Sequence, residues 1–265
     1  MGIQQITFGG NALTYQVSGS GSQTLVFIHG GGLDHQMWEA QAQYFNKHYR
    51  VVSYDLRGHG QSTHKNNEGL DMDDLLAILH TIGVENFTLI GCSLGSIIAL
   101  DLALAYPQKV NKLALVSPGL VGFQERNHEY LEVLAEYIGY IEKQNTQQAK
   151  MILKKLTFYG PHRWQVNNLV TDFYVEQCLS QFLESGQFAR IPQLKEFEPL
   201  KRISSIQCPL LLVYGKLDYG YIHENVEKIE MLVPQAETIE LDQVAHLPNM
   251  EQPEEFNSVL AAFIA

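Results

Sequence analysis

The strongest chemical signal in the sequence is a serine held between two glycines. The pentapeptide Gly91-Cys92-Ser93-Leu94-Gly95 ends an apolar, strand-like run and precedes the helical pattern of residues 97–106. A serine in such a strand-to-helix turn occupies a strained backbone conformation that exposes its hydroxyl, and the flanking glycines leave room for the turn. The motif therefore predicts Ser93 as a nucleophile.

A serine hydroxyl needs a base to take its proton, and the base needs a carboxylate to orient it. Asp218 follows the strand-like run 210–215, and His246 follows the last strand-like run of the chain. Both positions fall beyond the carboxyl ends of predicted parallel strands, the edge at which active sites of such sheets form. We predict Ser93, His246 and Asp218 as nucleophile, base and orienting acid.

Two other places for the acid fit less well. Asp242 lies closer to the end of its own strand, where it is better placed to position a loop. The strand ending at Ser117 is followed by residues 117–123, which contain no carboxylate. Asp218 is therefore preferred by elimination as well as by place.

Glycines supply the third part of the predicted site. Residues 30–32 are all glycine and follow the strand-like run 25–29, so their backbone N–H groups can face a ligand. Together with the N–H group of Leu94, one of them can hold the negative oxygen of a tetrahedral intermediate. We predict Gly31 and Leu94 as the oxyanion hole, with Gly32 as a second loop donor that contacts substrate.

Tyr219 is the other candidate substrate-binding residue, because it follows Asp218 directly. Packing against the rest of the protein explains this tyrosine equally well. Both interpretations remain open at the level of sequence.

The elements that must position these residues indicate an α/β protein. Short runs rich in Val, Ile and Leu alternate with helical patterns, which is typical of a mostly parallel sheet covered by helices on both faces. The runs are 25–29, 51–55, 87–91, 113–117, 210–215 and 238–242. Two alternating segments, Ile3 to Phe8 and Leu13 to Val17, predict an antiparallel hairpin at one edge, which makes eight strands.

The alternation of strand-like runs and helical patterns is interrupted in the middle of the chain. Within residues 122–206, apolar residues recur at intervals of three and four, so we predict an inserted helical cap, with residues 1–121 and 207–265 forming the core. The cap is rich in aromatic residues, which either form its own small core or line an apolar pocket. Its arginines are Arg126, Arg163 and Arg190. One of them could bind a substrate carboxylate, but surface ion pairing is the favoured interpretation.

Composition excludes several classes of function. The chain has 265 residues and a net charge of −11, without a basic run that could neutralise a nucleic-acid backbone. Its apolar stretches are shorter than the roughly 20 residues of a membrane span, and its first residues do not resemble a signal peptide. Three widely spaced cysteines predict no disulfide framework, so we expect a cytoplasmic protein without membrane or nucleic-acid partners.

No cofactor or metal is expected. The histidine pairs His29 with His35, and His59 with His64, have no carboxylate or cysteine pattern that completes a metal site. The glycines around His59 do not continue at the spacing of a dinucleotide-binding loop.

With these motifs, the sequence resembles the α/β-hydrolase fold superfamily, in particular its small, capped serine esterases and lactonases. The resemblance rests on these motifs: 28-IHGGG-32, 51-VVSYDLRGHGQS-62, 90-IGCSLGS-96, 214-YGKLD-218 and 245-AHLPNMEQPEEF-256. The last block is similar to that of enol-lactonases and related carboxylesterases. The resemblance implies an eight-stranded α/β-hydrolase sheet, and a structural role for Asp55 and the RGHGxS turn.

Departures from the family pattern narrow the chemistry. A serine nucleophile disfavours the aspartate-based dehalogenase and epoxide hydrolase branches. Carbon–carbon hydrolases of the family usually carry Trp after the histidine, where this chain has Leu247 and Pro248. Ser96 stands where many relatives have another glycine, a change that leaves the chemistry intact.

The expected function is hydrolysis of a small carboxylic ester or lactone through an acyl-enzyme, by a monomer or homodimer. The same residues would serve an acyltransferase, a thioesterase, a perhydrolase or a carbon–carbon hydrolase. A further alternative is a ligand-sensing receptor on this fold, with slow or no turnover. Turnover itself would discriminate between the enzyme and the receptor.

Overall fold

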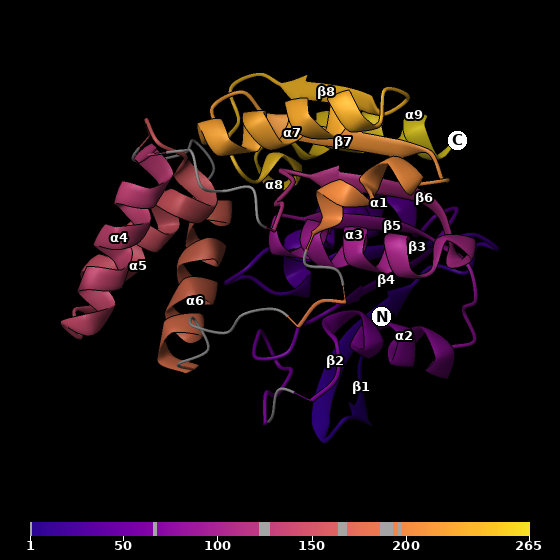
Figure 1. Cartoon of the computed structure of the whole chain (residues 1–265). Coiled ribbons are helices and arrows are strands. Elements are labelled where there is room, and N and C mark those ends of the chain that lie inside the picture. The colour runs from indigo at the N-terminus through magenta and orange to yellow at the C-terminus, as the bar shows by residue number, and fades with distance from the viewer. Residues whose placement is uncertain (1, 66–67, 122–127, 164–168, 186–192, 196–197) are drawn as a thin grey trace.

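The computed structural model describes the chain except residues 1, 66–67, 122–127, 164–168, 186–192 and 196–197 (Figure 1). The described residues form one sheet of eight strands. They are β1 (Ile3–Phe8), β2 (Asn11–Ser18), β3 (Thr24–Ile28), β4 (Arg50–Tyr54), β5 (Phe87–Cys92), β6 (Val110–Val116), β7 (Leu210–Gly215) and β8 (Glu237–Leu241). Each strand-like run expected from the sequence corresponds to one of these strands.

The strands lie in the order β1-β2-β4-β3-β5-β6-β7-β8. β2 pairs antiparallel with both β1 and β4, and every other pair is parallel. All residues of β3 are buried, as expected for a parallel strand covered on both faces. The mostly parallel eight-stranded sheet, with its antiparallel hairpin at one edge, is confirmed.

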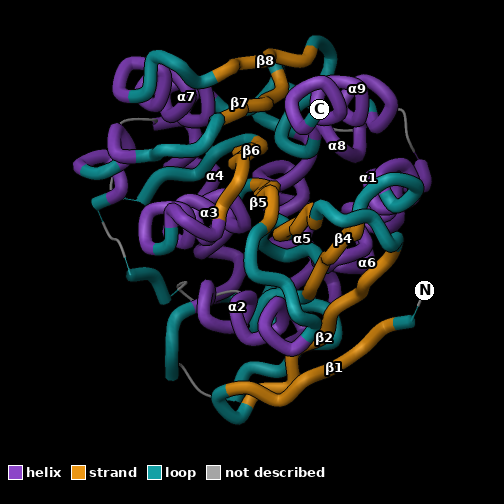
Figure 2. Tube along the Cα trace, turned by 90° about the vertical axis from the view of Figure 1, so that its right-hand side faces the viewer, coloured by secondary structure: helices purple, strands orange, loops and turns teal. Residues whose placement is uncertain are grey.

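Helices cover both faces of this sheet, as Figure 2 shows. One face carries α2 (Asp71–Thr81), α3 (Leu94–Ala105) and α7 (Gly220–Leu232), and the other carries α1 (Glu39–Phe45) and α9 (Pro253–Ile264). Alternate residues of β3 belong to the two apolar clusters, with Val26 and Ile28 in one and Leu25 and Phe27 in the other. Because successive side chains of a strand point to opposite faces, β3 contributes to an apolar cluster on each face of the sheet.

The expected helical insertion lies between β6 and β7. It contains α4 (His128–Glu142), α5 (Thr146–Lys154), a π-helical turn (Lys155–Tyr159) and α6 (Leu169–Ser185). These helices stand together at one side of the sheet (Figure 1). We keep the name cap for this insertion; its limits at 122 and 206 stay a prediction, and residue 122, Arg126 and Arg190 lie outside the described residues.

The cap shares its apolar interior with the rest of the protein. Phe158, Val175 and Leu179 are fully buried and belong to the same cluster as Trp38, which precedes α1. The cap therefore packs as part of one continuous core, on the side of the sheet that carries α1 and α9.

The cysteines are free thiols, and Cys92 is fully buried beside Ser93. Burial raises the pKa of the Cys92 thiol, which suits a small apolar core residue. Across the described ranges, no helix combines the length and apolarity that a membrane span requires. A cytoplasmic location stays a prediction.

Candidate active site

Ser93 is the single residue between β5 and α3. Its backbone has φ 52° and ψ −112°, a conformation that costs a residue with a side chain about 1–3 kcal/mol. The turn is possible because its neighbours lack side chains: a Cβ on Gly91 would collide with the carbonyl of Gly95, and one on Gly95 with the carbonyl of Ile28. The sequence motif thus builds the strained turn that it predicts.

The three predicted catalytic residues form one hydrogen-bonded chain. Ser93 Oγ lies 2.9 Å from His246 Nε2, and His246 Nδ1 lies 2.8 Å from Asp218 Oδ2. The other carboxylate oxygen of Asp218 accepts the backbone N–H of Tyr219 at 2.8 Å. Asp218 and His246 are almost completely buried, whereas Ser93 is half-buried.

This chain of contacts favours one tautomer of His246 when Asp218 is ionised. An ionised carboxylate can only accept, so Nδ1 of His246 carries the proton shared with Asp218. Nε2 is then the acceptor for the hydroxyl of Ser93, which is the arrangement a general base requires. Asp242, the alternative acid, pairs with Lys216 at 2.8 Å, and its side chain is 72% exposed. Asp218, and not Asp242, is the carboxylate that contacts His246.

The glycine loop after β3 lies against this turn. A Cβ on Gly30 would approach Cβ of Ser93 at 3.7 Å, and one on Gly31 would approach Cδ2 of Leu94 at 3.6 Å. Within the part of the chain that the structure describes, the N–H groups of Gly31 and Leu94 take part in no hydrogen bond. Both donors are therefore available beside the serine, as an oxyanion hole requires.

Gly32 bends this loop toward the cap. Its φ of +77° favours glycine, and a Cβ there would come within 2.8 Å of Leu179 on α6. Gly32 also lines a cavity of about 160 Å³, together with Asp34, His59 and Phe182; Ser93 and His246 are not among the described residues that line it. The predicted substrate-binding role of Gly32 stays a prediction.

Tyr219 lies in a cluster of tyrosines. Its side chain is fully buried, and its ring centroid is 5.8 Å from that of Tyr130 on α4 and 6.2 Å from that of Tyr221. Its hydroxyl has no hydrogen-bond partner among the described residues. The cluster supports the packing interpretation, and substrate contact by Tyr219 stays a prediction.

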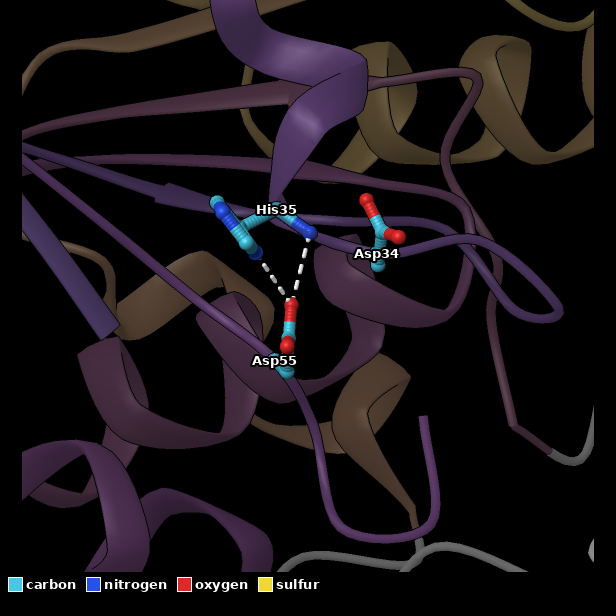
Figure 3. A group of neighbouring side chains, drawn as sticks. All are labelled: Asp34, His35 and Asp55. Atoms are coloured by element: carbon cyan, nitrogen blue, oxygen red, sulfur yellow. Dashed lines mark hydrogen bonds and ion pairs between the residues drawn. The ribbon is translucent and has the colours of Figure 1, made fainter. Parts of the chain in front are cut away.

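Asp34 and His35, which follow the glycine loop, lie close to Asp55, which follows β4 (Figure 3). A histidine and two carboxylates so close together could suggest a metal site. The backbone N–H and Nδ1 of His35 lie 2.9 and 2.6 Å from Asp55 Oδ1, and the N–H of Gln61 donates to the other oxygen at 2.8 Å. Asp34 accepts the hydroxyl of Tyr174 at 2.8 Å. Protein donors thus occupy these carboxylates, so the group is suited to holding loops.

Two polar bridges between the cap and the core were not anticipated from the sequence. One joins Tyr174 on α6 to Asp34, just after the glycine loop. The other joins Arg163, after the π-helical turn, to Glu251 at the end of α8 (Pro248–Glu251). The motif block around His246 contained Glu251, but nothing in the sequence paired it with a cap residue.

The whole arrangement matches a known family. The alpha/beta hydrolase fold family matches residues 23–253, which covers most of the chain. The chain belongs to the alpha/beta hydrolase fold family. The resemblance stated from its motifs is thereby confirmed, together with the fold class.

Curated relatives of this alpha/beta hydrolase include esterases and lactonases. The chain is 29% identical to the pimeloyl-(acyl-carrier protein) methyl ester esterase of Vibrio cholerae serotype O1, over 95% of this chain and 98% of that protein. It is 25% identical to 3-oxoadipate enol-lactonase 1 of Acinetobacter baylyi, over 96% and 94%. These relatives support ester hydrolysis as the general activity.

Solved structures show the same fold. The N-acyl homoserine lactone degrading enzyme Est816 superposes with a TM-score of 0.79 at 24% identity, over 98% of this chain and 100% of that chain. The enol-lactonase of Burkholderia xenovorans LB400 superposes with a TM-score of 0.77 at 17% identity, over 98% and 99%. At these identities the likeness speaks for the fold alone.

Proposed function

We propose that this alpha/beta hydrolase is a serine hydrolase that cleaves a small carboxylic ester or lactone through an acyl-enzyme. The observation that carries the proposal is the 2.9 Å contact between Ser93 Oγ and His246 Nε2, at a strained turn and backed by Asp218. Nucleophile, base and orienting acid in this order are the arrangement that activates a serine hydroxyl.

Acylation starts when Ser93 Oγ attacks the acyl carbon. His246 Nε2 takes the hydroxyl proton as the new Oγ–carbon bond forms, and Asp218 stabilises the resulting imidazolium through Nδ1. The N–H groups of Gly31 and Leu94 hold the oxygen that becomes negative. The carbon–oxygen bond to the leaving alcohol then breaks, and His246 returns its proton to that alcohol.

Water completes the cycle at the same atoms. His246 takes a proton from a water molecule as its oxygen attacks the acyl carbon, and the second oxyanion uses the same two N–H groups. Collapse of this intermediate breaks the bond to Ser93 Oγ, which regains its proton from His246. The carboxylic acid leaves, and no redox step or cofactor enters the balance.

The proposed substrate class rests on the curated relatives. The curated relatives carry the names of a methyl ester esterase and an enol-lactonase. We therefore favour short-chain esters and small lactones as substrates.

The first experiment combines turnover and labelling. Wild type and Ser93→Ala are assayed with p-nitrophenyl esters of increasing acyl length and with small lactones, and both are treated with a fluorophosphonate probe. We expect short esters or lactones to be hydrolysed and the probe to label only wild type.

Two results would contradict the proposal in different ways. Equal labelling of Ser93→Ala would place the reactive nucleophile elsewhere. Labelling of wild type without turnover of any ester or lactone, accompanied by a ligand-dependent rise in melting temperature, would favour the ligand-sensing alternative.

A further inference from the structure

A bridge from the cap reaches the loop that carries His246. Nη1 of Arg163 lies 2.6 Å from Glu251 Oε2, and Nη2 lies 3.1 Å from Oε1. The side chains are 19% and 7% exposed, so this two-pronged pair is largely withdrawn from water. Such a pair fixes direction as well as distance.

Arg163 is itself held by the cap. Its Nε donates to the carbonyl of Tyr159 at 2.7 Å, and Nη2 also donates to the carbonyl of Phe158 at 3.3 Å. Nη1 additionally approaches the carbonyl of Gln243 at 3.5 Å. The protein thus takes up the guanidinium donors, which leaves Arg163 poorly suited to bind a substrate carboxylate.

Glu251 connects Arg163 to the residue before His246. Its Oε1 accepts the backbone N–H of Ala245 at 2.9 Å, and Ala245 immediately precedes His246. A hydrogen bond to a carboxylate is stronger than one between neutral groups. The chain of contacts therefore runs from the cap through Arg163, Glu251 and Ala245 to His246.

Close packing reinforces this connection. Gly160 has φ +76°, and a Cβ there would collide with the carbonyl of Leu217 and lie 3.0 Å from Cβ of Ala245. Leu217 precedes Asp218 as Ala245 precedes His246. The end of the π-helical turn therefore touches the loops of both the acid and the base.

The charges within the bridge depend on each other. Burial raises the pKa of Glu251, while the hydrogen bonds and positive charge of Arg163 act against that rise. Without Arg163 the carboxylate would be a buried charge with no counter-ion, which is strongly unfavourable. Removing Arg163 thus weakens the acceptor that holds Ala245.

We propose that Arg163 and Glu251 are positioning residues for His246, so that docking of the cap and correct placement of the base are one event. This inference rests on the proposed function in naming His246 as the base. A displacement of His246 by about 1 Å would lengthen its contact with Ser93, and errors of that size cost roughly 100-fold in rate.

The test compares Arg163→Met with Arg163→Lys and with Lys150→Met. Lys150 pairs with Glu176 at 2.7 Å inside the cap. Lys150→Met therefore also removes one positive charge and one ion pair of the cap, but at a place that does not contact the loop of His246. For Arg163→Met we expect kcat and the rate of fluorophosphonate labelling to fall roughly 10- to 100-fold. KM should stay within about threefold, because no substrate contact is lost.

The other variants should differ in a defined way. Arg163→Lys keeps the charge and should recover part of kcat, and Lys150→Met should keep both rates. Melting temperatures are recorded so that every assay is run on folded protein. A wild-type kcat in Arg163→Met, or a raised KM with unchanged kcat, would overturn the proposal.

Hydrogen exchange tests the bridge without substrate. Peptides that contain Ala245 and His246 should exchange faster in Arg163→Met than in wild type or Lys150→Met, because the Ala245 amide loses its anchored acceptor. Unchanged exchange would also overturn the proposal. Since this readout needs no turnover, it remains decisive if Ser93→Ala shows that the serine is not the nucleophile.

Discussion

The molecule contains two buried histidine–aspartate pairs of similar geometry. His246 Nδ1 lies 2.8 Å from Asp218, and His35 Nδ1 lies 2.6 Å from Asp55. Both pairs follow strands at the same edge of the sheet, and the histidine side chains are only 4% and 3% exposed. Distance and burial alone therefore do not separate the proposed base, His246, from His35.

The surroundings of the pairs make the difference. The outer nitrogen of His246 faces the hydroxyl of Ser93, a residue in a strained turn. In the other pair, Asp55 also receives the backbone N–H groups of His35 and Gln61, so that the carboxylate joins two loops. The two pairs thus differ in what surrounds them: Nε2 of His246 contacts a serine hydroxyl, whereas the carboxylate beside His35 also holds two backbone N–H groups.

The largest expected effect separates the two histidines directly. His246→Gln should lower kcat by about 10⁴- to 10⁶-fold, because no group remains that takes the proton of Ser93. His35→Gln should destabilise the protein while folded molecules still react with the fluorophosphonate probe at Ser93. Loss of labelling in a folded His35→Gln variant would remove the distinction between the pairs.

The second prediction compares Asp218 with Asp55: the Asn variant of Asp218 should affect mainly kcat, and that of Asp55 mainly stability. Asp218→Asn should lower kcat by about 10⁴-fold, because the amide favours the wrong tautomer of His246. Its free energy of unfolding should fall by only about 1 kcal/mol, since the amide oxygen can still accept the N–H of Tyr219. Steady-state kinetics and urea unfolding measure the two quantities, and an Asp218→Asn variant with near wild-type kcat would contradict the assignment of the acid.

Asp55→Asn should show the opposite balance. An amide has one acceptor oxygen, so its NH₂ group would face a donor, and the charge of His35 would lose its partner. Breaking a buried pair in this way costs about 3–5 kcal/mol of unfolding free energy. The fraction of protein labelled at low temperature should stay close to wild type. A stable Asp55→Asn variant that no longer labels would assign this pair to the chemistry.

Much of the core site could be predicted because its signals are local. The serine turn is encoded within five residues, Gly91 to Gly95, and the two glycines leave the space that the strained conformation of Ser93 needs. Asp218 and His246 come directly after strands, and parallel strands bring such positions to one edge of the sheet. The positions of the three residues directly after strands were therefore enough to predict that they lie together.

The cap contacts could not be predicted in this way. Arg163 and Glu251 are 88 positions apart, and Tyr174 and Asp34 are 140 apart. Helical periodicity shows which face of a cap helix is apolar, but the pairing of its polar groups depends on how the cap docks. The sequence favoured ion pairing for Arg163, but the identity of its partner, Glu251, follows only from the docked cap.

The smallest expected effect concerns the pH dependence of stability and tests the charge of the pair at His35. Burial alone would lower the pKa of His35, but the hydrogen bond and negative charge of Asp55 together raise it above its ordinary value of 6.5. Its stabilising contribution is therefore complete below pH 6.5 and is lost as the pH rises through the raised folded pKa. The free energy of unfolding should fall above pH 6.5, and this fall should be shallower in His35→Gln.

His29 helps to choose the pH window for that measurement. Burial lowers its pKa, so its contribution is lost below pH 6.5 and is constant above it. Asp55 acts lower still: burial would raise its pKa, but His35 lowers it, so its contribution is lost only below its ordinary value of 3.8. Urea unfolding between about pH 6.5 and 8.5 therefore isolates His35 within this cluster, and equal slopes for wild type and His35→Gln would show that the pair carries no charge.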